Sequence, residues 1–394
     1  MSNIPKLRFP EFKGEWEEKK LSDFMTRLTR KNSNNESSRT LTISSVDGLI
    51  DQGEFFKKQI ASKDTSGYYL LKKGDFAYNK SYSVGYDYGS IKRLDRYEDG
   101  VVSTLYICMS LTSDTNSDYL THYFDSMKWN KSVSEISAEG ARNHGLLNIP
   151  TEAFFQTKHY LAPTLAEQQK IADFLSNVDS IITAETKILN TLKKKKKALM
   201  QKLFTQQLRF KSADGTDFPA WEEKKLGECV EILDSQRKPI ESKERANRKG
   251  EYPYYGASGI IDYIDDYLFE GESILLGEDG ANIINRNSRL AFIATGKYWV
   301  NNHAHIMKAN ADNLNYFICE YLESLDYSKI CAGSAQPKLT QDVIRNLTIK
   351  APCKEEQQKI ADCLSSLDSL IQTQQKVVTT WQQRKKALLQ QMFI

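Results

Sequence analysis

The sequence predicts a mixed α/β (α+β) protein in which two globular domains are separated by two long helices that pair as a coiled coil, which is antiparallel if the internal repeat is a pseudo-twofold one. Three observations predict this fold. Segments of the chain recur almost unchanged, and the longer of them carries apolar residues at the ~3.5-residue period of a coiled coil. The stretches between the repeated segments differ from each other and contain short β-prone runs bounded by glycine, asparagine and aspartate.

The repeat is a duplicated frame around two different inserts. EQQKIAD at Glu167–Asp173 recurs at Glu356–Asp362, 189 residues later, and the same offset aligns two KKAL tetrapeptides further along. WEEKKL at Trp16–Leu21 recurs at Trp221–Leu226, 205 residues later. Because the two offsets differ, the inserts between the markers differ in length, and they show little likeness to each other.

Each EQQKIAD segment opens a predicted long helix, over residues 162–207 and 351–394. Alternate steps of four and three residues from Ile171 and Ile360 reach ten positions in each helix, and eight of them are apolar. The polar exceptions fall at the same two places in both copies, which suits two related helices that pair with each other. The predicted pairing seam contains Ile171, Leu175, Val178, Ile182, Leu189, Leu192, Leu199 and Leu203 in the first helix and Ile360, Leu364, Leu367, Ile371, Val378, Trp381, Leu388 and Met392 in the second.

The direction of pairing depends on the symmetry of the repeat. Antiparallel pairing follows if a pseudo-twofold axis relates the halves, whereas the period alone leaves the direction open. The alternative is that each helix packs only on its own domain. A capping box of Thr164 and Glu167 after Pro163 predicts the start of the first helix, and Pro352 marks the equivalent start of the second. About 40 residues at ~1.5 Å each give each helix a length of roughly 60 Å.

The predicted organisation is a lead-in segment (1–21), a first domain (22–161), the first long helix, a connector that repeats the lead-in (208–226), a second domain (227–350) and the second long helix. The predicted strands of the two domains are Thr40–Val46, Gly67–Leu71, Val101–Leu111, Ser273–Leu276, Leu290–Ala294 and Trp299–Met307. The predicted helices of the domains are Asp118–Lys128 and Asn313–Leu325.

The charge balance bears on a nucleic-acid partner. The formal net charge is +3, from 54 basic and 51 acidic residues, which is not the charge of a protein that coats DNA. Residues 22–161 hold 17 basic and 17 acidic side chains, and residues 227–350 hold 14 and 18. If DNA is the partner, it meets local basic patches on otherwise neutral domains.

The six cysteines form no C-x-x-C pair, which predicts reduced thiols and neither a disulfide framework nor a zinc site. The first residues, MSNIPKLRFPEF, lack the apolar core of a secretory signal, and no apolar run approaches the ~18 residues of a membrane span. We therefore expect a cytoplasmic protein without membrane contact.

Catalytic motifs are absent from the sequence. It contains no P-loop, no glycine-rich methyl-donor loop and no N/D-P-P-Y/F tetrad of the adenine methyltransferases. Gly256–Gly259 is typical of a tight turn, and Asp234, Glu241 and Lys243 are too closely spaced in a lysine-rich stretch to predict a nuclease centre. His303-Ala304-His305 can present two imidazoles on one strand face, but no further ligands stand nearby. We expect no catalytic centre, no metal site and no cofactor bound by this chain.

Both inserts instead interleave tyrosine with basic and amide side chains. Arginine and lysine can pair with guanine, asparagine and glutamine can pair with adenine, and the cations also hold phosphates. The alternative is that these residues are solvated loops over half-buried tyrosines. The candidate DNA-binding residues are Lys80, Ser81, Tyr82, Tyr86, Lys92, Arg93, Arg142, Asn143 and His144 in the first insert and Arg237, Lys238, Tyr254, Tyr255, Asn282, Arg286, Asn301, Asn302, His303, Gln336 and Lys338 in the second.

A proline followed by EQQKIAD and a long lysine-rich helix, twice, with an LRF…WEEKKL lead-in at Leu7 and Leu208, resembles the specificity (S) subunit of type I restriction-modification systems. The likeness spans essentially the whole chain. Tyr252–Gly259 followed by Gly271–Gly280 also resembles segments of that family's target-recognition domains.

The resemblance implies that residues 22–161 and 227–350 are target-recognition domains at opposite ends of an antiparallel helix pair, each reading one half of a bipartite site in double-stranded DNA. It implies two modification subunits that complete an adenine-specific DNA methyltransferase, and restriction subunits that add an ATP-dependent endonuclease and translocase. The chain is then non-catalytic by itself, and S-adenosylmethionine, ATP and Mg²⁺ are expected on the partner subunits.

Because the inserts differ, the two half-sites are expected to differ and the whole target to be non-palindromic. Two other classes of function stay open beside this one. The first is a coiled-coil adaptor or scaffold whose inserts bind proteins. The second is a self-contained restriction enzyme, against which the missing methyl-donor and nuclease motifs count.

Overall fold

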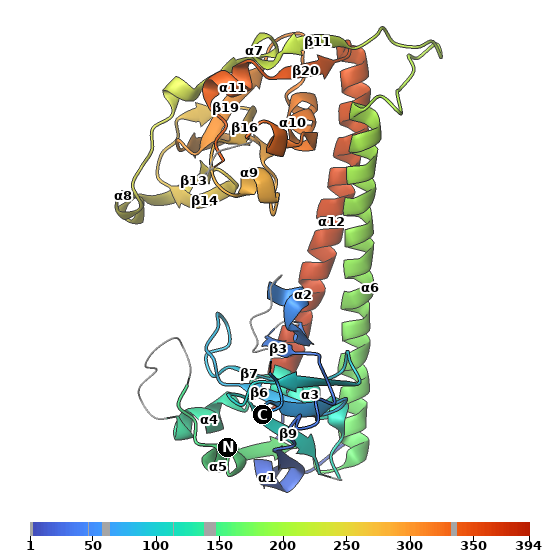
Figure 1. The fold of residues 1–394 in the computed structure, drawn as a ribbon, viewed down its shortest axis with the longest axis vertical. Coiled ribbons are helices and arrows are strands. Elements are labelled where there is room, and N and C mark those ends of the chain that lie inside the picture. Colours follow the sequence, from blue (N-terminus) through green and yellow to red (C-terminus); the bar gives the residue numbers. More distant parts are fainter. Residues whose placement is uncertain (1–2, 46, 57–63, 113, 138–146, 332–336) are drawn as a thin grey trace. The chain divides into compact units, whose positions relative to one another are not determined.

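The computed structural model describes residues 3–45, 47–56, 64–112, 114–137, 147–331 and 337–394 (Figure 1). The chain divides into two compact units: unit 1 contains Met1–Thr186 and Lys376–Ile394, and unit 2 contains Lys187–Gln375. Two long helices, α6 (Leu165–Phe204) and α12 (Lys354–Met392), each contribute one half to each unit. The rest of each unit is a mixed α/β domain, as the sequence predicts.

The domain of unit 1 is built on a four-stranded antiparallel sheet in the order β2-β9-β6-β7. Its strands are β2 (Met25–Leu28), β6 (Phe76–Asn79), β7 (Ser90–Arg93) and β9 (Ile107–Leu111). Three further antiparallel pairs join β1 (Glu17–Lys20) to β10 (Lys158–Leu161), β3 (Leu41–Ser44) to β4 (Gly48–Asp51), and β5 (Tyr69–Lys72) to β8 (Asp99–Val102). The helices are α1 (Leu21–Phe24), α2 (Gln52–Phe56), α3 (Ser117–Asp125), α4 (Asn130–Ile136) and α5 (Thr151–Phe155).

The domain of unit 2 contains two four-stranded sheets and one strand pair. The first sheet has the order β12-β19-β16-β17 and contains β12 (Val230–Ile232), β16 (Ser273–Gly277), β17 (Ala291–Ala294) and β19 (Ala304–Ala309). The second sheet has the order β14-β13-β18-β15 and contains β13 (Lys249–Gly256), β14 (Gly259–Ile264), β15 (Phe269–Glu270) and β18 (Lys297–Val300). The pair joins β11 (Glu222–Lys225) to β20 (Thr348–Ala351). The helices are α7 (Leu226–Cys229), α8 (Ser242–Asn247), α9 (Asn282–Asn285), α10 (Asn315–Ser324) and α11 (Gln341–Arg345), with 3-10 turns η1 (Asp234–Gln236) and η2 (Tyr327–Lys329).

Two of the predicted strands are each divided in two. Val101–Leu111 contains parts of β8 and β9, because a turn at Ser103, whose carbonyl accepts from Tyr106 N at 3.1 Å, interrupts the run. Trp299–Met307 likewise contains parts of β18 and β19, separated by a turn in which Asn301 Oδ1 accepts from His303 N at 2.8 Å. The sequence analysis therefore missed a short polar turn inside each of these two β-prone runs.

The repeated WEEKKL segments form equivalent strands in the two units. In unit 1, β1 pairs with β10 so that Glu17 faces Leu161, and in unit 2, β11 pairs with β20 so that Glu222 faces Ala351. The lead-in and the connector are therefore hydrogen-bonded to the segment that directly precedes each long helix.

The glutamate of each EQQKIAD segment is buried and accepts hydrogen bonds from an arginine and a tryptophan of the lead-in (unit 1) or of the connector (unit 2). We call each such set of three residues a socket. In unit 1, Glu167 accepts from Arg8 Nε at 2.7 Å and from Trp16 Nε1 at 3.2 Å, and its side chain is 1% exposed. In unit 2, Glu356 accepts from Arg209 Nη2 at 2.6 Å and from Trp221 Nε1 at 3.1 Å. These hydrogen bonds raise the pKa of both arginines.

The predicted capping box is therefore only half right. Thr164 Oγ1 accepts from Glu167 N at 3.2 Å, as predicted. The Glu167 carboxylate turns to Arg8 and Trp16 instead of closing the box, because a guanidinium and an indole N–H offer it a buried, charge-assisted set of donors.

Removing the arginine of a socket should destabilise the unit that contains it. We expect Arg8→Ala to lower the free energy of unfolding of unit 1 by about 2 kcal/mol, because Glu167 would keep one hydrogen-bond donor but lose its charge partner. Denaturant-dependent hydrogen exchange in α3 measures this loss. Arg209→Ala is the matched control and should weaken exchange protection in α10 while leaving α3 unchanged. Equal losses in both helices from either variant would contradict the expectation.

Within each unit the two long helices run antiparallel. In unit 1, Lys385 Nζ lies 2.6 Å from Asp179 Oδ1, and in unit 2, Lys196 Nζ lies 2.7 Å from Asp368 Oδ2. The aspartates are equivalent positions of the repeat, as are the lysines, each pair standing 189 residues apart. The same cross-helix contact is therefore made twice, and the predicted antiparallel coiled coil with a pseudo-twofold repeat is confirmed. Lys196 and Lys385 each occupy one of the two polar positions in their helix's seam, and the ion pair with the facing helix accounts for a charged residue there.

All sixteen predicted seam residues are buried or half-buried. The ends of the helices also enter the domain cores: Leu389, Met392 and Phe393 of unit 1 pack with Trp16 and Phe24 of the same unit. The alternative in which each helix packs only on its own domain is therefore wrong. Among the described helices, none combines the length and the apolar character that a membrane crossing demands.

Candidate nucleic-acid interface

In unit 1, β6 and β7 are joined by a hairpin loop of residues 80–89 that carries four of the predicted contact residues. The side chain of Tyr82 is 54% exposed, and Ser81 and Tyr86 are half-buried. Ser81 N donates to Asn79 Oδ1 at 3.1 Å, so the first turn of the loop is held by a side chain of the strand. The loop therefore presents aromatic surface from a fixed base.

Lys80 stands at the start of this loop beside a small polar cavity. The cavity has a volume of about 50 Å³, and Arg27, Thr104 and Thr151 line it together with Lys80. Burial lowers the pKa of Lys80, and its amine has no partner among the described residues. Because an unpartnered, partly desolvated amine gains most from a new acceptor, Lys80 is well suited to a base edge or a phosphate.

Lys92 and Arg93 on β7 have internal partners. Lys92 Nζ lies 2.7 Å from Asp125 Oδ1, and Arg93 contacts Asp95 at 2.6 Å and Asp118 at 2.7 Å. These ion pairs tie β7 to α3 and give both cations a structural role. Their contact with DNA stays a prediction, as does that of Arg142, Asn143, His144 and Gln336, which lie outside the described residues.

In unit 2 the exposed candidates are Lys238, Asn302, His303 and Lys338. His303 Nδ1 lies 2.8 Å from Asp279 Oδ2. Lys338 is 54% exposed, and its Nζ lies 3.2 Å from Glu278 Oε1. These side chains combine amide, imidazole and amine groups that can reach a ligand from solvent.

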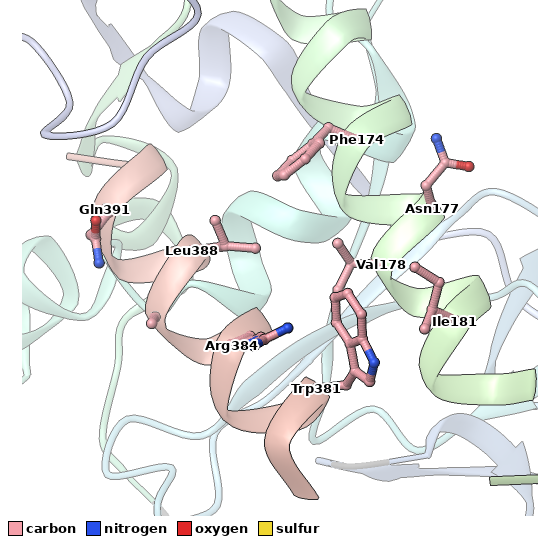
Figure 2. A pocket seen from close by; sticks show the side chains of 9 residues that line it. Phe174, Asn177, Val178, Ile181, Trp381, Arg384, Leu388 and Gln391 are labelled. Atoms are coloured by element: carbon pink, nitrogen blue, oxygen red, sulfur yellow. The ribbon is translucent and has the colours of Figure 1, made fainter. Parts of the chain in front are cut away.

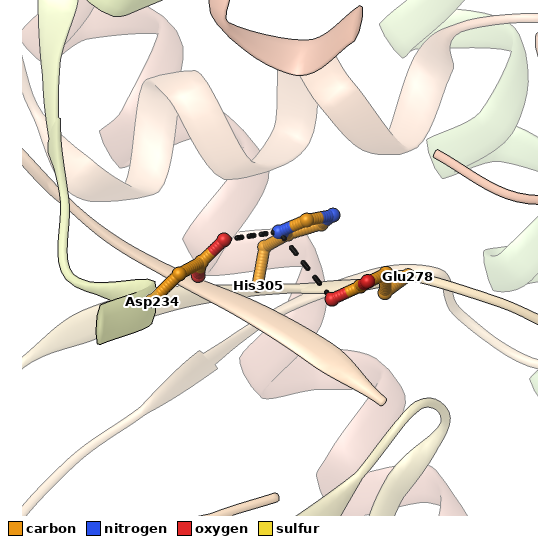
Figure 3. A group of neighbouring side chains, drawn as sticks. All are labelled: Asp234, Glu278 and His305. Carbon is orange, nitrogen blue, oxygen red and sulfur yellow. Dashed lines mark hydrogen bonds and ion pairs between the residues drawn. The ribbon is translucent and has the colours of Figure 1, made fainter. Parts of the chain in front are cut away.

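Beneath them lies an ion network that connects distant segments of unit 2 (Figure 3). His305 Nδ1 lies 2.5 Å from Asp234 Oδ2 and 3.8 Å from Glu278 Oε2, while its Nε2 donates to the Leu339 carbonyl at 2.7 Å. Burial opposes ionisation of Asp234, but the hydrogen bond and charge of His305 together with Arg237 lower its pKa below the ordinary value. Sequence reasoning missed this network because its members are far apart in the chain.

The ligand atoms of Asp234, Glu278 and His305 lie within 4.8 Å of one another, but the cluster does not fit a divalent cation. Arg237 Nη1 donates to Glu278 Oε2 at 2.8 Å, and its Nη2 lies 3.5 Å from Asp234 Oδ2. A metal ion there would be placed against a guanidinium that already pairs with both carboxylates. The cluster therefore acts as a structural ion network, and Arg237 is part of it.

Three other candidates of unit 2 shape its backbone. Asn282 accepts from Ser288 N at 3.0 Å, and Asn301 is 5% exposed and supports the turn between β18 and β19. Arg286 has a φ of 50° and lies 2.8 Å from Glu323 Oε1. Their predicted DNA contacts are untested, and the structure gives each of them a local role.

Tyr254 requires a correction. Its side chain is fully buried, and its hydroxyl accepts from Ile240 N at 2.9 Å. It belongs to the core under β13, because the strand turns alternate side chains inward, and it is not available to a ligand. The neighbouring Tyr255 is half-buried, and burial raises the pKa of its hydroxyl.

The helix pair of unit 1 also has a hollow on its surface (Figure 2). Its volume is about 440 Å³, and its lining is almost entirely apolar. Figure 2 shows Phe174, Val178 and Ile181 of α6 facing Trp381 and Leu388 of α12 across it. Val178, Trp381 and Leu388 were predicted as seam residues, but sequence reasoning missed that Phe174 and Ile181, seven residues apart, extend this apolar surface beyond the seam.

The chain matches a known family over most of its length. The family model described as the type I restriction modification DNA specificity domain matches residues 13–194 and 220–380. A putative type I restriction enzyme specificity subunit of Haemophilus influenzae is 35% identical over 147 residues, which is 37% of this chain and 37% of that relative's length. The MjaVIII type I restriction enzyme specificity subunit of Methanocaldococcus jannaschii is 26% identical over 318 residues, 74% of this chain and 72% of the relative.

A solved structure has the same fold. The crystal structure of a type I restriction-modification system S subunit from M. genitalium superposes with a TM-score of 0.59 at 14% identity, covering 99% of both chains. At this identity the likeness concerns the arrangement of the elements and not individual contact residues.

Proposed function

We propose that this chain, which belongs to the type I restriction-modification DNA specificity family, acts as the DNA sequence-specificity subunit of a type I restriction-modification complex. The observation that carries the proposal is the double match of the DNA specificity domain, at residues 13–194 and 220–380. Each match contains one mixed α/β domain and most of one long helix. Each domain then reads one half of a bipartite DNA site.

The two half-sites differ, and the target is non-palindromic. The support for this is the difference between the two domains: among the described residues unit 1 has one four-stranded sheet, whereas unit 2 has two, and their exposed candidate residues are not equivalent. Lys80 and Tyr82 are the strongest candidates for contact in unit 1, and Lys238, Asn302 and Lys338 in unit 2. Lysine suits guanine or phosphate, and asparagine suits adenine.

The helix pair sets the number of unread base pairs between the half-sites and docks two modification subunits. The apolar hollow lined by Phe174 and Trp381 supports docking, because exposed apolar patches on a protein surface mark interaction sites. Methyl transfer to adenine and DNA cleavage then belong to the modification and restriction subunits, with S-adenosylmethionine, ATP and Mg²⁺ bound there. The chain contributes recognition and geometry.

The experiment that tests this function is genome-wide mapping of adenine methylation in the native host, with and without this gene. We expect deletion to abolish methylation of one bipartite, asymmetric motif, because no other chain of the complex would read that sequence. Restoring the gene should restore the motif. Co-expression with the modification subunits in a host without methylation provides the same readout if the native system is silent.

An unchanged methylome in both hosts would overturn the proposal and favour a coiled-coil adaptor. Loss of a continuous or palindromic motif would contradict the assignment of two different half-sites to two different domains.

A further inference from the structure

The tip of the β6–β7 hairpin carries the most exposed of the large apolar side chains in the described part of the chain. Val84 is 90% exposed. Tyr86 N donates to the Ser83 carbonyl at 2.8 Å, which closes a four-residue turn over Val84 and Gly85. Gly85 has a φ of +81°, the left-handed value that a type II turn requires at this position. Val84 therefore stands at the apex of a defined turn.

Side-chain hydrogen bonds at the base of the hairpin hold the turn in place. Ser83 Oγ lies 3.2 Å from Ser45 Oγ, which lies 3.2 Å from Ser90 Oγ on β7. Tyr78 OH donates to the Tyr88 carbonyl at 2.7 Å. A loop with this many internal hydrogen bonds has already lost much of its conformational entropy, so a ligand can bind its tip without ordering it.

Neither packing nor turn preference explains a valine at this place. Turn apices favour glycine, proline, asparagine and aspartate, whereas valine suits strands. Leaving it in solvent also forgoes the free energy that burial of an apolar side chain supplies. Tyr82 and Tyr86 flank it in sequence, and the partly buried amine of Lys80 stands at the base of the same hairpin. Aromatic side chains beside a basic group are typical of a surface that contacts nucleic acid, and Val84 lies between them in sequence.

We propose that Val84 is a specificity-determining residue of unit 1 that contacts the 5-methyl group of a thymine in the major groove. This inference rests on the proposed function. The major groove of B-DNA admits a two-stranded β-ribbon, and the thymine methyl is the apolar group displayed there. A valine has no hydrogen-bond donor or acceptor in its side chain, so it reads that methyl group by contact and disfavours cytosine, which lacks it.

The test uses the complete complex of this chain with its modification subunits and duplexes that carry the mapped motif. Each thymine of the motif is replaced in turn by deoxyuridine, which removes only the methyl group. For one thymine, in one half-site, we expect the wild-type complex to lose roughly tenfold in methylation efficiency, the lower end of what one lost apolar carbon contact costs. Val84→Ala should lose a similar factor on the thymine duplex and be insensitive to deoxyuridine at that position.

The matched control is Ile261→Ala, which truncates an apolar side chain that is 53% exposed on β14 of unit 2. It should leave the deoxyuridine effect at the Val84 thymine unchanged. Thermal denaturation of Val84→Ala should match that of the wild type, because the side chain has almost no packing to lose.

Three outcomes would overturn the inference: motif halves without a thymine, a Val84→Ala complex as sensitive to deoxyuridine as the wild type, or a variant that fails to assemble with the modification subunits. The last would identify the tip as a protein contact. A wild-type complex that methylates no bipartite motif would instead overturn the proposed function itself, so the two failures are distinguishable.

Discussion

Inserting one heptad into each long helix is expected to lengthen the unread spacer of the methylated motif by about three base pairs and to leave both half-sites unchanged. Seven residues add about 10 Å to a helix, and one base pair occupies about 3.4 Å of duplex. The insertions belong after Thr186 and after Gln375, where the chain divides between the units. There they preserve the contact of Asp179 with Lys385 and that of Lys196 with Asp368.

Seven residues also keep the seam in phase, because they match one full coiled-coil repeat. The control is an insertion in α6 alone, which makes the two cross-helix ion pairs incompatible and should abolish methylation. Methylation mapping with a library of motif variants reads out both experiments. A changed half-site with an unchanged spacer would refute the role of the helix pair as a ruler.

Replacing Lys196 with methionine is expected to lower the free energy of unfolding of unit 2 by about 3 kcal/mol. Lys196 Nζ lies 2.8 Å from Glu320 Oε2 and 2.7 Å from Asp368 Oδ2, and the Glu320 side chain is 1% exposed. The variant would remove one of the cations that pair with the buried Glu320 carboxylate. Loss of a cation from a buried carboxylate destabilises a protein far more than loss of a surface ion pair does. Denaturant-dependent hydrogen exchange in α10 measures the effect.

The pseudo-twofold repeat supplies a matched control in Lys385→Met. Lys385 Nζ lies 2.6 Å from Asp179 and 3.8 Å from Asp125, but these carboxylates are 40% and 22% exposed. Water can solvate them after the lysine is lost, so we expect a cost of about 1 kcal/mol in unit 1. Equal costs for the two lysines would show that burial of the partner carboxylates does not govern these contacts.

The two long helices and the residues through which they pair were predicted from the sequence with little error. The seam positions are buried or half-buried, as their period requires, and the polar interruptions at Lys196 and Lys385 are explained by cross-helix partners. The candidate site was read less well. Tyr254 belongs to the core, and Lys92 and Arg237 are held in ion pairs with carboxylates of their own units.

The sequence by itself determined the duplicated frame and the residues of the coiled-coil seam, because duplication and periodicity are properties of order along one chain. Only the tertiary structure decided which basic and aromatic side chains are available to a ligand. Availability depends on residues distant in sequence. Ile240 N donates a hydrogen bond to the buried hydroxyl of Tyr254, and Asp125 holds Lys92 in an ion pair. The tertiary structure also revealed Val84, because exposure at a hairpin apex follows from how two strands are joined and not from the residue type.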